Sequence, residues 1–103
     1  MRALSPSLDG AAVEVSGEIN RPPMPESASA TLFPIAQDVM PGIAGVAVGG
    51  GSDGNFTAAR GVPTLDGLGA VGGGAHADHE FLIVDTMVER AALLEGILRR
   101  LLA

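Results

Sequence analysis

Histidines in a glycine-rich segment are the first residues of this sequence whose types could do chemistry. His76 follows the triple glycine in GGGAHADHE, and His79 comes three residues later. A neutral imidazole in such a loop can ligate a metal ion or transfer a proton. A zinc site needs three or four ligands, so two histidines alone do not define one. The alternative for His76 is a loop histidine exposed to solvent.

A second glycine cluster could bind an anion. Residues 49–54 read GGGSDG, which matches G-x-G-x-x-G after an expected strand. We reject a dinucleotide site, because the helix that follows ends before Gly61 and a strand–helix–strand unit takes about 30 residues. We expect instead that Gly50, Gly51, Ser52 and Asp53 form a turn at a helix N-terminus, with backbone N–H groups facing a carboxylate. A tight turn with no ligand is the alternative.

Arg21 is a candidate for binding a carboxylate, because a guanidinium can donate two parallel hydrogen bonds to its oxygens. It lies between Asn20 and a pair of prolines. A surface arginine without a ligand is the alternative. The loop acids Asp53, Asp66 and Asp78 have no spacing that marks a catalytic pair.

The composition excludes several classes of partner. The 103 residues carry six basic side chains against twelve acidic ones, a net charge of −6, and only three aromatic side chains. Nucleic acid is therefore not an expected partner, because the chain lacks a basic stripe and stacking aromatics. Its apolar stretches are too short to span a membrane, so we expect a cytoplasmic chain with no membrane partner. The absence of cysteine excludes disulfides and thiolate ligands.

The hydrophobic pattern of the first half predicts two strands and a helix. Residues 11–20 alternate apolar and polar side chains, as in a half-buried antiparallel strand that ends at the prolines after Arg21. Residues 26–40 show helical spacing, although Pro34 conflicts with a helix that begins so early. Residues 43–48, IAGVAV, form a continuous apolar run typical of a strand buried on both faces.

The second half predicts short elements followed by one long helix. A short helix is expected after the glycine cluster, and residues 61–65 and 81–84 favour short strands. Thr86 and Glu89 have the spacing of a capping box, and Glu95 and Arg99 that of a favourable helical ion pair. The apolar face of this final helix is expected to consist of Met87, Val88, Ala91, Leu94, Ile97, Leu98 and Leu101.

Several of these motifs, taken in order, resemble the C-terminal portion of one enzyme superfamily. The motifs are NRPPM, GGGSDGNF, and GVPTLDGLGAVGGGAH with Glu80 four residues after His76, followed by the C-terminal helix. They resemble the zinc aminoacylase and carboxypeptidase G superfamily, which includes glutamate carboxypeptidase, acetylornithine deacetylase and succinyl-diaminopimelate desuccinylase. The glutamate-carboxypeptidase-like members are the most similar. The resemblance begins near residue 11 and covers the rest of the chain.

The resemblance implies an α/β fold in two parts. Residues 1–22 would be the last strand of an antiparallel lid domain, through which the family often forms homodimers. Residues 23–103 would be the C-terminal segment of the metallopeptidase catalytic domain, with helices flanking a short mixed sheet. His76 would be a zinc ligand, and Arg21 would hold the substrate's terminal carboxylate. The turn of Gly50, Gly51, Ser52 and Asp53 would line the carboxylate pocket.

The reaction that the resemblance implies is hydrolysis of an amide next to a carboxylate, by a water held between two zinc ions. The substrate would be an acylated amino acid or peptide. The family's remaining ligands, a His-x-Asp pair, a bridging aspartate and a Glu-Glu pair, are not found: the only His-x-Asp lies at His76 itself, and no Glu-Glu occurs. We therefore expect an incomplete catalytic domain, with no catalytic residue of its own and inactive alone. The alternative is a non-catalytic binding or assembly module on the same α/β scaffold.

Overall fold

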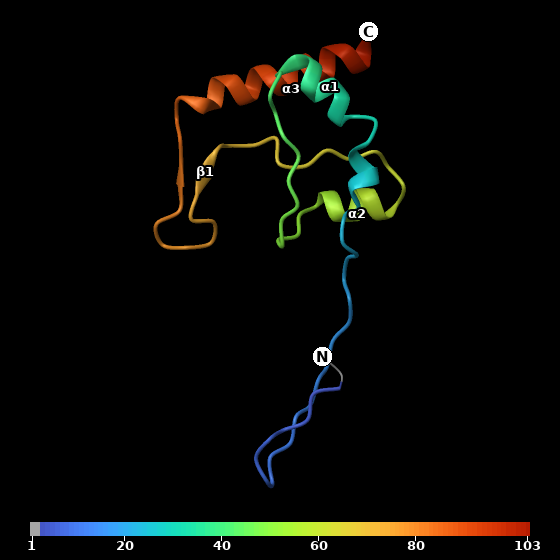
Figure 1. The fold of residues 1–103 in the computed structure, drawn as a ribbon, viewed down its shortest axis with the longest axis vertical. Coiled ribbons are helices and arrows are strands. Elements are labelled where there is room, and N and C mark those ends of the chain that lie inside the picture. Colours follow the sequence, from blue (N-terminus) through green and yellow to red (C-terminus); the bar gives the residue numbers. More distant parts are fainter. Residues whose placement is uncertain (1–2) are drawn as a thin grey trace.

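The fold combines short helices, one long helix and a small sheet. A computed structural model describes residues 3–103 of the chain. In chain order the elements are the short 3-10 helix η1 (Glu26–Ser29), α1 (Phe33–Val39), α2 (Gly54–Ala59), β1 (Gly72–Gly73), β2 (Phe81–Leu82) and α3 (Thr86–Leu102). The expected α/β class is confirmed (Figure 1). The two strands are antiparallel, with Gly72 opposite Leu82 and Gly73 opposite Phe81.

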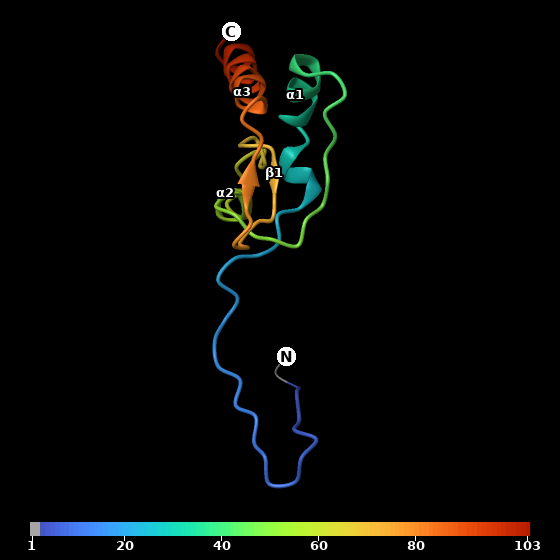
Figure 2. The ribbon, with the colours of Figure 1, turned by 90° about the vertical axis from the view of Figure 1, so that its left-hand side faces the viewer.

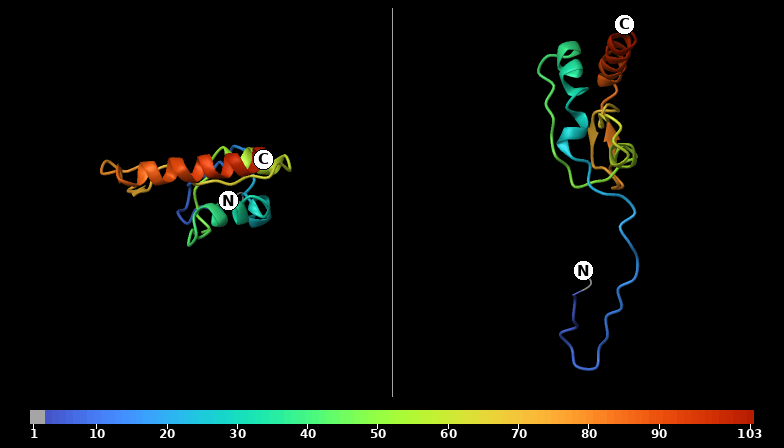
Figure 3. Two further views of the ribbon diagram at one scale, coloured as in Figure 1. Left: turned by 90° about the horizontal axis from the view of Figure 1, so that it is seen from above. Right: turned by 90° about the vertical axis from the view of Figure 1, so that its right-hand side faces the viewer.

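The core lies between α1 and α3, which run side by side (Figures 2 and 3). Its fully buried side chains are Ala36 of α1 and Leu93 and Ile97 of α3. Gly96 permits this close approach, because a Cβ added there would lie 2.5 Å from Cγ1 of Val39. The partly buried side chains around this core are Ile35, Val39, Met40, Ile43, Leu65 and Leu68.

Pro34 explains why the helix expected over residues 26–40 is divided. The segment forms η1 and then α1, which begins at Phe33 and places Pro34 in its first turn. Proline is tolerated there, because the first N–H groups of a helix have no intrahelical acceptor. The conflict between Pro34 and a continuous helix is thus resolved by a late start.

The long C-terminal helix is confirmed as α3, but its start and its buried face differ from expectation. Thr86 is its first residue, and the Thr86 hydroxyl donates to the carbonyl of Ile83 at 2.7 Å, so the predicted capping box is wrong. Leu93, which is outside the predicted face, is 1% exposed, whereas Leu94 is 44% exposed. The buried face lies beside Gly96, where the missing side chain leaves room for Val39 of α1.

The expected ion pair on α3 is present. Arg99 donates to a carboxylate oxygen of Glu95 through Nε at 2.9 Å and through Nη2 at 2.7 Å. Both side chains are exposed, so the pair contributes well under about 1 kcal/mol. Within residues 3–103, no helix combines the length and apolar character needed to cross a membrane.

Two of the three strands predicted after residue 40 are wrong. Residues 43–48 and 61–65 form no strand, and Val46 and Val48 are 80% and 76% exposed. A strand requires a neighbouring strand to satisfy its N–H and C=O groups, and α1, α3 and the hairpin provide none beside these segments. Residues 61–65 dock on η1 instead, because the amide of Thr64 donates to Ala28 at 2.8 Å and its carbonyl accepts from Ser29. The third run, residues 81–84, does contain β2.

The N-terminal segment projects away from the helices (Figures 1 and 2). Residues 11–20 form no strand, and Ile19 is 87% exposed. The half-buried strand predicted there is therefore wrong, and Val13 and Val15 of its expected apolar face are 48% and 42% exposed. Assignment of residues 1–22 to a lid domain remains a prediction, and residues 1 and 2 lie outside the described range.

The folded chain leaves an unusually large surface exposed. Its accessible surface is 8341 Å², whereas a compact monomer of 10.3 kDa exposes about 5,400 Å². Its radius of gyration is 19.0 Å, against about 13 Å for a compact domain of this length. The exposed apolar side chains outside the N-terminal segment include Val46, Val48, Met87, Leu94, Leu98 and Leu101. Such surface favours association with other polypeptide.

A pair of neighbouring substitutions on α3 tests the assigned core. Leu93→Ala should lower the free energy of unfolding by about 3 kcal/mol, because it leaves a cavity against Ala36. Leu94→Ala, on the exposed side, should lower it by less than about 1 kcal/mol. Urea unfolding followed by circular dichroism measures both, and equal effects would contradict the assigned face.

Candidate functional site

The second glycine cluster forms a turn that leads into α2, as expected. Ser52 organises this turn: its hydroxyl accepts from the amide of Gly54 at 3.1 Å and donates to Oδ2 of Asp66 at 2.7 Å. The amide of Ser52 donates to Oδ1 of Asn55 at 2.9 Å. The amide of Asn55 in turn donates to the carbonyl of Ser52 at 3.2 Å, so Ser52 and Asn55 exchange two hydrogen bonds around the helix start. Asp53 is the N-cap by backbone geometry, and its own side chain makes no capping bond.

Arg21 docks on this turn from a distant part of the sequence. Its Nη1 donates to the carbonyl of Ser52 at 3.1 Å, and its Cζ lies 4.7 Å from the ring centroid of Phe56. A Cβ added at Gly51 would lie 3.6 Å from Cδ of Arg21, so the arginine stem runs along the glycine. Arg21 is half-buried there. The structure therefore brings Arg21, Gly51 and Ser52 together.

The backbone donors of the turn are only partly available to a ligand. The amides of Ser52 and Gly54 are used internally. The amides of Gly50 and Gly51 find no acceptor within residues 3–103. Of these four amides, only those of Gly50 and Gly51 are therefore unbonded within residues 3–103.

Sequence reasoning missed two residues of this cluster and undervalued a third. Neither Asn55 nor Phe56 is among the site residues predicted from the sequence, and Asp66 is predicted only as an isolated loop acid. The spacing of Ser52 and Asn55 is a signal that could have identified the first, because polar side chains three residues apart cap helices. Nothing local in the sequence marks Phe56 or Asp66, since their partners lie far along the chain.

His76 lies in the loop between β1 and β2, and its backbone is in the left-handed region with φ 66°. Histidine is among the few residues other than glycine that adopt this conformation. The loop is held by bonds from the amide of Ala77 to Gly74 at 2.9 Å and from the amide of Glu80 to Ala77 at 3.0 Å. The imidazole of His76 is exposed. The hairpin is separated from α2 in Figure 1, so His76 and Arg21 do not form one cluster.

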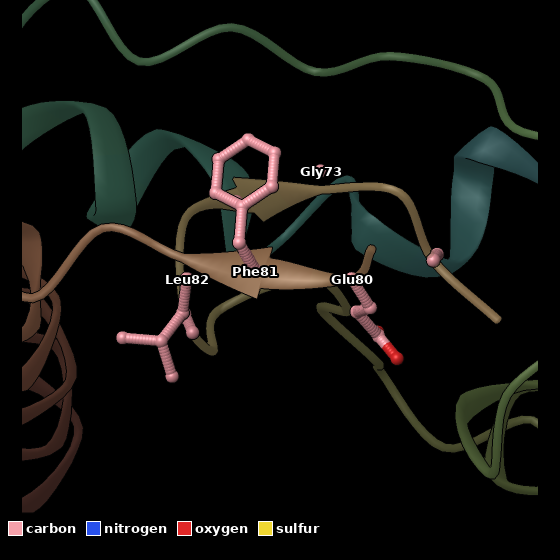
Figure 4. A pocket seen from close by; sticks show the side chains of 7 residues that line it. Gly73, Glu80, Phe81 and Leu82 are labelled. Carbon is pink, nitrogen blue, oxygen red and sulfur yellow. The ribbon is translucent and has the colours of Figure 1, made fainter. Parts of the chain in front are cut away.

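The hairpin that carries His76 depends on close backbone approach. A Cβ added at Gly72 would lie 2.0 Å from the carbonyl oxygen of Phe81, and one at Gly73 would lie 3.0 Å from the Phe81 ring. An open pocket of about 430 Å³ lies beside the two strands. Phe81 and Leu82 point to opposite sides of β2, as strand geometry requires (Figure 4). His76 is not among the residues that line this pocket.

Arg90 of α3 holds the glycine-rich loop of residues 67–69, which precedes β1. Its Nε donates to the carbonyl of Gly69 at 2.9 Å, and its Nη2 donates to the carbonyl of Gly67. These bonds tie α3 to the segment that leads into β1. The sequence gives no local sign of this role, because the two carbonyls lie more than twenty residues before Arg90.

A comparison with sequence models of known protein families shows which family the chain belongs to. The sequence model of Peptidase family M20/M25/M40 matches residues 7–100. The chain belongs to this peptidase family. The match supports the zinc aminoacylase superfamily as a whole, and not one specific member of it. No curated protein and no solved structure is significantly similar to the chain.

Family membership raises the question of a metal, because members of this family generally depend on zinc. Within residues 3–103, no three His, Asp or Glu side chains lie close enough together to hold a metal ion. His76 is a single exposed imidazole, and a protein zinc site needs at least three such ligands. The described residues therefore do not fit a complete zinc site, and the role of His76 as a ligand stays a prediction.

Gly72→Ala tests whether the hairpin presents His76 as described. The added Cβ would meet the Phe81 carbonyl oxygen, so the register of Gly72 with Leu82 should be lost. Cross-strand nuclear Overhauser effects between β1 and β2 should disappear. Gly69→Ala is the matched control, because nothing lies within 4 Å of a Cβ added there. Retention of the cross-strand signals in Gly72→Ala would contradict the register.

Proposed function

We propose that this chain is the carboxylate-binding portion of a zinc-dependent amidohydrolase of the glutamate-carboxypeptidase kind. Its substrate would be an acylated amino acid or peptide, cleaved at the amide next to a free carboxylate. The observation that carries the proposal is the docking of Arg21 on the Ser52 turn, in a chain that the peptidase family matches over residues 7–100.

The geometry of Arg21 suits a carboxylate. Its bond to Ser52 and its position over Phe56 hold the guanidinium plane. Its Nη2 has no acceptor within residues 3–103 and is free to donate to a ligand oxygen. The free amides of Gly50 and Gly51 lie on the same turn. A guanidinium with nearby N–H donors is a common way to bind a carboxylate, because each charge-assisted bond is stronger than a neutral one.

We infer that the chemical step requires polypeptide outside these 103 residues. The chain offers His76 as one imidazole, and no group of residues among 3–103 completes a metal site around it. The large exposed apolar surface supports contact with such polypeptide. The same exposed surface also favours a second candidate function, that of a binding or assembly module without catalysis. The two candidates differ in whether Arg21 recognises a substrate.

Titration with N-acetyl-L-glutamate, followed by NMR of the labelled chain, tests this recognition. We expect the signals of Arg21 Nε–H and of the Gly50 and Gly51 amides to shift. Arg21→Lys should weaken binding about tenfold, because a lysine has a single nitrogen and cannot donate to the Ser52 carbonyl through one nitrogen and to the ligand through another. Arg60→Lys is the matched control, since Arg60 is an exposed arginine at the end of α2.

The control ligand is an N-acetylated amino acid amide, which lacks the free carboxylate. It should cause no shift of the Arg21, Gly50 and Gly51 signals. Equal binding by the wild-type chain and Arg21→Lys would contradict the proposal. A wild-type chain that binds no N-acetyl-L-glutamate, yet self-associates, would favour the assembly module.

A second test concerns zinc and catalysis by the chain alone. We expect neither tight zinc binding nor hydrolysis of N-acetyl-L-glutamate, because one exposed imidazole cannot hold the ion. Calorimetric titration with zinc measures the first, and release of glutamate measures the second. Sub-micromolar zinc affinity together with turnover would refute this expectation.

A further inference from the structure

The side chain of Asn55 joins two segments that are distant in the sequence. Its Oδ1 accepts from the amide of Ser52 at 2.9 Å, and its Nδ2 donates to the carbonyl of Pro22 at 2.9 Å. Pro22 directly follows Arg21, whose guanidinium donates to the carbonyl of Ser52. Three hydrogen bonds and the Arg21–Pro22 peptide bond therefore form a closed ring that contains Arg21, Pro22, Asn55 and Ser52.

The bond to Pro22 is not needed to begin α2. The bond between Asn55 and the Ser52 amide already satisfies a backbone donor at the helix start. The Pro22 bond instead anchors the backbone beside Arg21, just after a segment that projects from the rest of the chain. An arginine side chain has much rotamer freedom to lose, so a fixed backbone next to it favours one guanidinium position.

We propose that Asn55 is a positioning residue that fixes Arg21 between Phe56 and the glycine turn. The role requires an amide, because one group must accept from Ser52 while the other donates to Pro22. That this placement serves recognition of a substrate carboxylate rests on the proposed function. The placement of Arg21 by Asn55 is independent of the proposed function.

Asn55→Asp separates the two bonds. An aspartate can still accept from the Ser52 amide and suits a helix N-terminus, but it cannot donate to the Pro22 carbonyl. Arg21 should then leave the Phe56 ring while α2 stays formed. The measurement is the ring-current shift of the Arg21 Hδ and Nε–H signals in the ligand-free chain, with backbone chemical shifts of residues 54–59 reporting on the helix.

Thr57→Val is the matched control on the same helix. It removes the bonds from the Thr57 hydroxyl to Gly54 and Thr64, and so loosens α2 without touching Asn55. Its Arg21 signals should match those of the wild type. If both variants move the Arg21 signals equally, or if Asn55→Asp leaves them unchanged, the positioning role is overturned.

Ligand titration uses the neutral variant Asn55→Ala, which removes the bonds to both Pro22 and Ser52 without adding a charge near Arg21. Its affinity for N-acetyl-L-glutamate should fall about fivefold. An unchanged affinity would overturn the link between Asn55 and recognition. A wild-type chain that binds no N-acetyl-L-glutamate would instead refute the proposed function, while the ring-current comparison still tests the placement of Arg21.

Discussion

The packing of α1 against α3 is the constraint on which the rest of the structure depends. Ala36, Leu93 and Ile97 are the only fully buried apolar side chains within residues 3–103, and Gly96 brings the two helices close enough to bury them. A core this small provides limited hydrophobic stabilisation, since that term scales with the apolar area removed from water. Loops on both sides of the core must therefore be held by polar contacts.

Two arginines provide such contacts in different ways. Arg90 extends from α3 and binds the carbonyls of the loop before β1, which orders the approach to His76. Arg21 comes from the N-terminal side and docks on the Ser52 turn, with Asn55 tying its backbone in place. Each arginine donates through Nε and one terminal nitrogen, and the other terminal nitrogen of each has no acceptor within residues 3–103. We propose recognition for Arg21 because the family resemblance implies a carboxylate-binding arginine at the Arg-Pro pair, and we assign a structural role to Arg90 because its bonds tie α3 to the loop before β1.

The separation of the Arg21 cluster from His76 agrees with a chain that contributes parts of a site rather than a whole one. The peptidase family matches nearly all of the sequence, yet no group of metal ligands assembles among residues 3–103. The exposed valines of residues 43–48 and the exposed leucines of α3 indicate where further polypeptide would pack. In that arrangement the two clusters would be brought into one site by contacts that this chain does not make alone.

The sequence by itself determined the elements whose stabilising contacts are local. The helix from Thr86, the Glu95–Arg99 pair and the turn at Ser52 follow from spacing within a few residues, and the motifs around Arg21 and His76 pointed to the family. Only the tertiary structure decided which face of α3 is buried, because apolar side chains lie on several sides of that helix and α1 packs on the side beside Gly96. It also decided that residues 11–20 and 43–48 form no strands, since a strand depends on a partner elsewhere. The roles of Asn55 and Arg90 likewise depend on carbonyls more than twenty residues away, which no local pattern records.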